Sequence, residues 1–438
     1  MQLASTLTGD EGGALRPKPA LGAPGAQTRS AIVATIAGNT LEFYDFLAYT
    51  AFAVYIGKAF FPARSELASL LLSLATFGVG FFTRPLGALL IGALADRAGR
   101  RPALLLTIGL MAVGTLAVAV TPSYATIGFA APLILVVARL IQGLALGGEV
   151  GPSNALLLEF APLHRRGAYI GWQGASQGIA VLAAGLVGLV LGIVLSKEQL
   201  ADWGWRVPFA LGLVIVPVGL VIRRRLPETL PAPGARGAGD VLRVLWREHR
   251  RSLVLAVLII MSLTISTYVM NYMTTYALTA LGLPASKAML STLTFGAILA
   301  AGSFWSGALA DRFGRRPVMI VSRIAVILAI YPAFVFLVDH RSAWALVFVT
   351  AALTVLGLAG SIAALTAVTE IFPSEVRSCG NATAYAASVS IFGGTTQFVI
   401  AWLIGATGDP LSPAYYVILS SLISLWAMFQ ISETKPAA

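Results

Sequence analysis

The chain alternates between long runs of apolar residues and short polar segments that carry most of its charge. Twelve apolar runs lie between the charge clusters and the Gly and Pro breaks, at about residues 31–57, 67–95, 102–121, 128–157, 167–195, 205–222, 252–280, 288–309, 317–338, 343–369, 379–407 and 412–432. A membrane-spanning helix needs about 20 apolar residues, and lipid offers no partner to unpaired backbone groups. The pattern therefore predicts an all-α membrane protein with twelve transmembrane helices.

Composition supports this class and excludes several others. Only 11% of the 438 residues are charged and 57% are hydrophobic, with a mean hydropathy of +0.83. Soluble domains carry roughly 25% charged residues, so a soluble enzyme, a disordered chain and a secreted disulfide scaffold are excluded. Cys379 is the single cysteine and cannot form an intrachain disulfide. His164, His249 and His340 form no metal-binding spacing with it, so no metal is expected.

Polar stretches divide the chain into five predicted parts. Residues 1–30 are rich in Gly, Pro, Ala and Thr without helical periodicity, which predicts a disordered cytoplasmic tail. Residues 223–251 are polar, contain three prolines and separate six spans from six. We therefore expect a six-helix N-terminal bundle at 31–222, a cytoplasmic linker at 223–251, a six-helix C-terminal bundle at 252–432 and a short cytoplasmic tail at 433–438.

The net charge of +11 is explained by topology. With twelve spans, 21 of the 30 Lys and Arg residues fall on the side of the two termini, six fall on the other side and three lie inside spans. Because Lys and Arg favour cytoplasmic loops, both termini are predicted to be cytoplasmic. The basic excess is therefore a topology signal and does not indicate nucleic-acid binding.

The two halves of the chain are related by an internal repeat. The loop from Gly92 to Pro102 reads G-A-L-A-D-R-A-G-R-R-P, and the loop from Gly307 to Pro317 matches it at ten of eleven positions, 215 residues later. A second motif, E-x-x-P-x-x-x-R, occurs after the fourth span and again after the tenth, 211 residues later. Parallel repeats of this kind enclose a midplane site in many transporters.

The repeated loop resembles the signature of the major facilitator superfamily. Positions across the fourth span and its loop also fit that pattern, namely Arg139, Gly143, Gly147, Glu159, Pro162 and Arg166. The segments G-N-T-L-E-F-Y-D-F from Gly38, R-L-I-Q-G-L-A-L-G-G-E from Arg139 and D-W-G-W-R-V-P-F from Asp202 resemble its metabolite:proton symporters. The resemblance covers residues 31–432 and implies two six-helix bundles that alternate access to a central site.

Within that branch, three further segments are similar to citrate and tricarballylate symporters. They are F-F-P-A-R-S-E-L-A-S-L from Phe60, W-Q-G-A-S-Q from Trp172 and T-G-D-P-L-S-P from Thr407. The resemblance implies proton-coupled import of citrate or a related di- or tricarboxylate. Relatives that carry 2-oxoglutarate, shikimate, or a zwitterion such as betaine or proline share most of these motifs and remain alternatives.

The resemblance also implies a cytoplasmic gate, in which ion pairs hold one state and break as the halves rock. The residues that match it are Asp96, Arg97, Arg100, Arg101, Asp311, Arg312, Arg315, Arg316, Glu159, Arg166, Glu370 and Arg377. The alternative is a static set of loops that satisfy helix ends and topology.

Five ionisable residues lie deep inside the first-half spans: Glu42, Asp45, Arg84, Arg139 and Glu149. Each costs about 2.5 to 3.5 kcal/mol on insertion scales, so these groups must pair, face water or be neutralised. Helical spacing places Glu42 and Asp45 on one face with Tyr49, and places Arg139 on one face with Gln142 and Glu149. We therefore expect them to line a cavity.

The two arginines are candidates for binding an anionic substrate, because guanidinium groups match carboxylates bidentately and stay charged. The carboxyl groups of Asp45, Glu42 and Glu149 are candidates for proton coupling, because substrate that captures an arginine would favour their protonation. The alternative is a set of fixed intramembrane ion pairs.

Neutral polar side chains complete the predicted site. Tyr49, Gln142, Gln173, Gln177, Asn271 and Tyr272 are candidate substrate contacts, although helix packing would explain the last four equally well. The deep charges of the first half have no counterparts in the second, where Arg323 is the only charge deep within a span. This asymmetry favours substrate and proton handling over a structural role.

Three functional classes are candidates for such a chain: a secondary symporter, an exporter on the same fold and a membrane enzyme. The chain has no G-x-x-x-x-G-K-[ST] loop for an ATP-driven pump and no H-E-x-x-H motif or arguable catalytic triad. Two buried arginines suit an anion better than the lipophilic cations of many exporters. We therefore expect a monomeric symporter in a bacterial cytoplasmic membrane, with the proton as coupling ion, no cofactor, no catalytic residue and no nucleic-acid partner.

Overall fold

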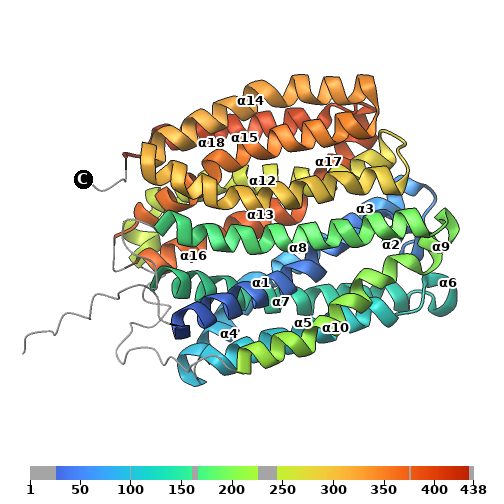
Figure 1. Ribbon diagram of the computed structural model, residues 1–438, viewed down its shortest axis with the longest axis horizontal. Helices are drawn as coiled ribbons and strands as arrows, with labels where there is room; N and C mark the ends of the chain where they lie inside the picture. Colours follow the sequence, from blue (N-terminus) through green and yellow to red (C-terminus); the bar gives the residue numbers. More distant parts are fainter. Residues whose placement is uncertain (1–25, 99, 160–165, 225–243, 374–375, 434–438) are drawn as a thin grey trace, which may run out of the picture.

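The structure is a computed structural model that describes residues 26–98, 100–159, 166–224, 244–373 and 376–433. Within these ranges every regular element is a helix, and the long helices run nearly parallel to the longest axis of the molecule (Figure 1). The predicted all-α architecture is confirmed.

The helices of the first half carry its six predicted spans. They are α1 (Ala26–Ala51), α2 (Ala53–Phe60), α3 (Glu66–Phe82), α4 (Arg84–Ala98), α5 (Arg100–Val120), α6 (Tyr124–Ile127), α7 (Ala130–Glu159), α8 (Arg166–Val194), α9 (Lys197–Asp202), the short 3₁₀ helix η2 (Gly204–Arg206) and α10 (Val207–Arg224). The helices of the second half are α12 (Arg250–Thr279), α13 (Ala285–Phe313), α14 (Arg315–His340), α15 (Ala343–Glu370), α16 (Arg377–Ser388), the π-helical turn η3 (Val389–Gly393), α17 (Gly394–Thr407) and α18 (Ser412–Phe429).

Ten helical segments of the described residues are long and apolar enough to cross a bilayer. The remaining two predicted spans coincide with α1 and α10, which pack against each other inside the first half. Large apolar side chains such as Leu90, Leu328 and Trp402 are exposed on the outer faces of the bundle. Because soluble proteins rarely expose so much contiguous apolar surface, these faces are suited to lipid. The chain is a multi-pass membrane protein.

Besides the span at 31–57, which is interrupted at Phe52 between α1 and α2, two other spans that were predicted as continuous helices are irregular. The span at 67–95 is interrupted at Thr83, because Pro85 has no backbone N–H and restricts the residue before it, Arg84. The span at 379–407 contains the π-helical turn η3. Such turns are frequent at functional sites. Apolar periodicity alone could not reveal either irregularity.

Two predicted boundaries also differ from the structure. Helix α1 begins at Ala26, inside the predicted tail, and residues 244–248 form a helical turn inside the predicted linker. Leu245 of that turn is buried in an apolar cluster beneath α12, which explains its order. Helices therefore extend beyond the apolar runs from which the spans were read. Residues 1–25 and 225–243 lie outside the described residues.

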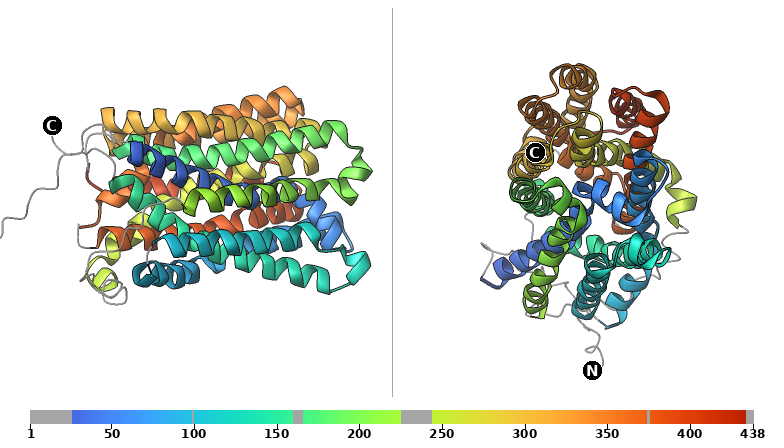
Figure 2. Two further views of the ribbon diagram at one scale, coloured as in Figure 1. Left: turned by 60° about the horizontal axis from the view of Figure 1, so that its bottom comes forward. Right: turned by 90° about the vertical axis from the view of Figure 1, so that its right-hand side faces the viewer.

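The two halves lie side by side when the molecule is viewed along its helices (Figure 2). Their longest contact runs between α8 of the first half and α13 of the second. Four glycines of α8 face α13 at intervals of seven residues, namely Gly171, Gly178, Gly185 and Gly192. Their nearest atoms belong to Ser303, Ala300, Leu293 and Ser286 of α13. We call this contact the glycine seam.

A second contact between the halves involves α3 and α17. A side chain at Gly78 would meet the backbone of Gly394, and the Thr275 hydroxyl of α12 donates to Thr50 O of α1 over 3.4 Å. Tyr268 of α12 packs against Phe81 with ring centroids 5.4 Å apart. The two helix irregularities, at Thr83 and at η3, therefore lie close to the boundary between the halves.

Candidate functional site

Close packing of α3 and α4 on α7 positions the two deep arginines. A side chain at Gly143 would clash with Gly80 O, and a side chain at Gly147 would clash with the backbone of Arg84. Gly80 in turn lies against Arg139 O, and the Thr83 hydroxyl donates to Leu140 O over 2.8 Å. Glycine permits this approach because it has no Cβ. The backbone break at Thr83 is thus held against the centre of α7.

Arg139 is fully buried, at 0% exposure. Its Nη1 donates to Gln142 Oε1 over 2.8 Å, and its Cζ lies 3.7 Å from the centroid of the Tyr49 ring. Nε and Nη2 have no hydrogen-bond partner among the residues that the structure describes. A buried guanidinium with two unused donors can bind a carboxylate in bidentate fashion.

Hydrogen bonds connect Arg139 to Asp45 through two neutral side chains. Gln142 Nε2 donates to Thr115 Oγ1 over 3.1 Å, and Thr115 Oγ1 donates to Asp45 Oδ2. Within the described residues no direct ion pair joins Arg139 to Asp45. The order Arg139, Gln142, Thr115, Asp45 defines what we call the α7–α1 relay. Thr115 was missed in the sequence, because a single threonine in an apolar span is not distinctive.

Glu42 and Asp45 lie on the same face of α1, as predicted from their spacing, and each is 3% exposed. The Thr107 hydroxyl of α5 lies 3.2 Å from Glu42 Oε1. Gly212 of α10 allows close approach to Asp45, since a side chain there would contact Asp45 Oδ1. The two carboxyl groups therefore contact different threonines of α5, and only Asp45 belongs to the α7–α1 relay.

Arg84 lies between aromatic rings. Its Cζ lies 4.1 Å from the centroid of the Phe81 ring and 4.7 Å from the centroid of the Phe46 ring. The Cζ of Arg139 lies 6.0 Å from the centroid of the same Phe46 ring. Nε and Nη2 of Arg84 have no hydrogen-bond partner among the described residues. Phe46 thus contacts both guanidinium groups, and cation–π contact stabilises their charges without using their donors. The two arginines predicted to bind an anion therefore lie near the same aromatic ring.

The predicted neutral residues divide into three groups. Gln142 and Tyr49 contact Arg139 directly. Gln173 donates instead to Asn39 Oδ1 over 3.1 Å at the interface of α8 with α1, and Gln177 of α8 is half-buried. In α12, Asn271 donates to Thr267 O over 3.0 Å, while Tyr272 is buried in the core. Packing therefore accounts for Gln173 and Asn271.

Tyr268 of α12 was not among the predicted site residues. Its hydroxyl interacts electrostatically with Arg84, as does that of Tyr385 from α16. The second half therefore contributes two phenol groups next to the first-half arginine. Helical spacing could place Tyr268 on a face with Asn271 and Tyr272, but only the fold shows that Arg84 is its neighbour.

Several predicted residues lie outside the described side chains. The side chain of Glu149 lies outside what the structure describes, and so do those of Asp96, Arg97, Arg100, Arg101, Glu159 and Arg166 in the first-half gate. The residues predicted for the second-half gate are described. Arg315 Nη2 lies 3.3 Å from Asp311 Oδ1, and Arg315 Nε lies 3.5 Å from Glu370 Oε2. These ion pairs join the ends of α13, α14 and α15 within the second half.

Three other groups surround that cluster. The Glu433 carboxylate accepts the backbone N–H groups of Arg315 and Arg316 at the start of α14, each over 3.0 Å. An anion at this position compensates the positive end of the helix. Arg377 donates from Nε to Phe372 O over 3.2 Å, and Arg312 lies beside the Phe313 ring. The cluster fixes the ends of three helices relative to one another.

We predict that Arg315→Gln slows transport without weakening substrate binding. Arg315 is 5% exposed and contacts two carboxylates, so its loss leaves Asp311 and Glu370 without this cation. We expect an initial uptake rate about tenfold lower at saturating substrate, with the equilibrium dissociation constant unchanged.

Arg316→Gln provides the control, because the Arg316 guanidinium donates to a backbone carbonyl, Phe429 O, over 3.1 Å. Weaker equilibrium binding in Arg315→Gln with a normal maximal rate would contradict a role in gating.

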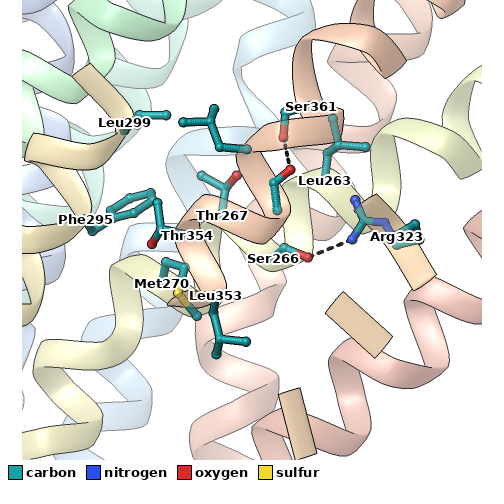
Figure 3. A pocket seen from close by; sticks show the side chains of 12 residues that line it. Leu263, Ser266, Thr267, Met270, Phe295, Leu299, Arg323, Leu353, Thr354 and Ser361 are labelled. Carbon is teal, nitrogen blue, oxygen red and sulfur yellow. Dashed lines mark hydrogen bonds between the residues drawn. The ribbon is translucent and has the colours of Figure 1, made fainter. Parts of the chain in front are cut away.

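A described cavity of about 50 Å³ lies entirely within the second half, between α12, α13, α14 and α15 (Figure 3). It includes Arg323, Ser266 and Thr354, and it includes none of the residues predicted for the substrate site. The sequence had identified Arg323 as the lone deep charge of the second half without assigning it to a site. Among the described residues, no group of three or more His, Cys, Asp or Glu could hold a metal ion.

Two helical halves, related by a repeat and enclosing buried charges at their boundary, define a membrane transporter. Residues 35–406 match the family model described as Major Facilitator Superfamily. The chain is 37% identical over 403 residues to a citrate-proton symporter of Klebsiella pneumoniae, covering 91% of this chain and 90% of that protein. It is 34% identical to the alpha-ketoglutarate permease of Escherichia coli strain K12 over 400 residues, covering 90% and 91%.

Similarity extends to a transporter of zwitterions and to solved structures. The chain is 32% identical over 422 residues to a proline/betaine transporter of Salmonella typhimurium, covering 93% of this chain and 84% of that one. The xylose transporter of E. coli in a partially occluded inward-open conformation has the same fold, with a TM-score of 0.76 at 17% identity over 94% of this chain and 100% of that one. The chain belongs to the major facilitator superfamily.

Proposed function

We propose that this protein is a proton-coupled symporter that imports an anionic carboxylate metabolite, most simply citrate or a related di- or tricarboxylate, by alternating access. The observation that carries the proposal is the α7–α1 relay, which links a guanidinium with two donors unused among the described residues to a buried carboxyl group. Similarity to citrate-proton symporters from two bacteria supports the same substrate class.

Arg139 and Arg84 bind carboxylate groups of the substrate in this proposal. Each offers two donors, and Phe46 contacts both guanidinium groups, so a molecule with several carboxylates can engage both arginines. A dicarboxylate such as 2-oxoglutarate also fits this charge pattern. A zwitterion such as betaine would have to place its cationic group near two arginines, so two guanidinium groups without an ion-pair partner among the described residues favour a polyanion.

The α7–α1 relay then couples substrate to proton. When Arg139 is unoccupied, its Nη1 donates to Gln142, which donates to Thr115, which donates to the Asp45 carboxylate. Substrate that draws the Arg139 guanidinium toward itself weakens the first of these bonds and the positive field at Asp45. Protonation of Asp45 becomes more favourable, and the loaded transporter carries a proton with its substrate.

The proton gradient can supply the required free energy. One net charge crossing 100 mV contributes about 2.3 kcal/mol, and one pH unit contributes about 1.4 kcal/mol. A single net positive charge per cycle therefore supports accumulation by several tens to hundreds. The protein works as a monomer in a bacterial cytoplasmic membrane in this proposal, with both termini in the cytoplasm and no cofactor other than the coupling proton.

Proteoliposomes test the assignment. Uptake of labelled citrate, tricarballylate, 2-oxoglutarate, shikimate and betaine should be compared with and without an inward pH gradient. We expect gradient-dependent uptake of citrate or a related polycarboxylate, and its loss on addition of a protonophore. Uptake that a protonophore leaves unchanged would point to facilitated diffusion or exchange instead, and outward accumulation would point to an exporter.

We predict that Asp45→Asn uncouples transport from the proton gradient. Asparagine resembles a protonated carboxyl group and can still accept a hydrogen bond from Thr115, so substrate binding and exchange should persist. Accumulation driven by a pH gradient should fall at least tenfold, while exchange of labelled for unlabelled substrate across the membrane stays within about twofold of the wild type.

Glu42→Gln is the matched control, because it neutralises the other carboxyl group on the same face of α1. Gradient-driven accumulation should persist in this variant. If Asp45→Asn accumulates substrate normally and Glu42→Gln does not, Glu42 is the coupling residue and the role of the α7–α1 relay is wrong.

A further inference from the structure

The second half contains a cavity with its own buried cation. Arg323 of α14 lines this cavity and is 4% exposed, and it is the only Lys, Arg, Asp or Glu deep inside a predicted span of the second half. Figure 3 shows its guanidinium beside Ser266 of α12. Nothing in the proposed transport mechanism uses this residue.

Arg323 has hydrogen bonds but no described counter-charge. Nη1 donates to Ser266 Oγ over 3.1 Å and lies 3.4 Å from both Ser262 O and Ser421 Oγ. Nε has no hydrogen-bond partner, and no carboxylate lies within ion-pair distance among the described residues. Neutral oxygens orient the group without balancing its charge. Because arginine stays protonated, a buried guanidinium is stabilised most effectively by an anion.

Hydroxyl groups around the cavity complement this cation. Ser266 accepts from Arg323, so its own hydrogen can be donated elsewhere. Thr267 also lines the cavity and is exposed, although 72% of the most apolar stretch of α12 lies inside the protein, the highest share among the ten helical segments that are apolar enough to cross a bilayer. The cavity is therefore open on this side of α12.

The cavity is separate from the Arg84 and Arg139 site. At 100° per residue, the α12 residues that line it, Leu263, Ser266, Thr267 and Met270, span an arc of about 100°. Tyr268, which packs against Phe81 of the first half, lies about 150° from the centre of this arc. The two groups occupy opposite faces of the same helix.

Volume limits what the cavity can hold. It measures about 50 Å³, and a single water requires about 10 to 15 Å³ on this measure. There is room for a few water-sized groups, which is enough for one carboxylate group or one halide ion. A whole tricarboxylate does not fit.

We propose that Arg323 and Ser266 form a second anion site, inside the C-terminal bundle, for a single carboxylate group or a small inorganic anion. The bound anion neutralises Arg323 and links α14 to α12, so it stabilises the packing of the second half. This site is independent of which metabolite is transported and of whether transport is coupled to protons.

Thermal unfolding of the purified full-length protein in lipid nanodiscs tests the proposal. The protein is titrated with sodium chloride in one arm and sodium acetate in the other, in a low-salt zwitterionic buffer. We expect a saturable rise in melting temperature in at least one arm. Arg323→Gln should raise the midpoint concentration at least tenfold. Saturation with acetate alone identifies a carboxylate site, and saturation with chloride identifies a site for inorganic anions.

Four further variants make the result decisive. Arg323→Lys and Ser266→Ala should raise the midpoint several-fold, and they keep the test valid if Arg323→Gln does not fold. Arg341→Gln removes an exposed arginine at the end of the same helix and should leave the midpoint unchanged. Arg139→Gln should also leave it unchanged, which separates this site from the transport site.

A wild-type protein without saturable stabilisation in either arm would overturn the proposal. So would equal midpoints in wild type, Arg323→Lys and Ser266→Ala. A response that disappears in Arg139→Gln but persists in the Arg323 variants would assign the anion to the transport site and also overturn it.

Discussion

Replacing Arg139 with glutamine should reduce the uptake of labelled citrate into proteoliposomes at least a hundredfold. The guanidinium is fully buried on the ring of Tyr49, and two of its donors are unused within the described structure. A hydrogen bond to a charged group contributes about 1.5 to 3 kcal/mol, so losing two removes about 3 kcal/mol or more. Each 1.4 kcal/mol corresponds to a factor of ten.

Arg139→Lys separates charge from geometry. Lysine keeps the positive charge but lacks the planar fork, so we expect an intermediate uptake, above that of Arg139→Gln and well below that of the wild type. Arg64→Gln is the control, since Arg64 is an exposed arginine in the loop before α3. Citrate binding to Arg139→Gln with wild-type affinity, in protein of normal thermal stability, would remove Arg139 from the substrate site.

Replacing Gly178 with leucine should abolish transport and lower the melting temperature of the purified protein. Gly178 is central in the glycine seam, where even a Cβ would contact the backbone of Ala300 and Leu299. Overpacking a well-packed interior costs about 1 to 3 kcal/mol when side chains can move. Here the obstacle is helix backbone, so α8 and α13 would have to separate. We expect uptake below a tenth of wild type.

Gly109→Leu is the matched control. Gly109 is also a helical glycine, but it is exposed on α5 and a side chain there would have no atom within 4 Å. We expect normal uptake and a melting temperature within a few degrees of the wild type. Gly178→Ala should lie between the two leucine variants. Normal transport by Gly178→Leu would mean that the seam is looser than its atomic contacts indicate.

The sequence predicted the helices well because each membrane-spanning helix requires a long run of apolar residues. Apolar runs near the thickness of the bilayer located all twelve spans, and the repeated loops related the two halves. The break at Thr83 and the π-helical turn were invisible, because Pro85 and the glycines near Gly393 lie within otherwise apolar stretches. Such irregularities depend on contacts with other helices.

Part of the candidate site could likewise be read from local spacing. The contact of Arg139 with Gln142 follows from an interval of three residues on one helix, and the shared face of Glu42 and Asp45 follows in the same way. Their connection through Thr115 required the packing of α5 against α7 and α1. The Arg323 cavity also required tertiary structure, because the sequence indicated an isolated charge but none of its neighbours.

The glycine seam constrains how the two halves can move relative to each other. From Gly171 to Gly192 it extends about 30 Å along α8, which is the full thickness of the hydrocarbon layer. Two helices in backbone contact over such a length resist separation, but they tolerate a small rotation about an axis that runs along their contact. Displacement then grows with distance from this axis, so helices far from the seam move the most while α8 and α13 remain almost stationary.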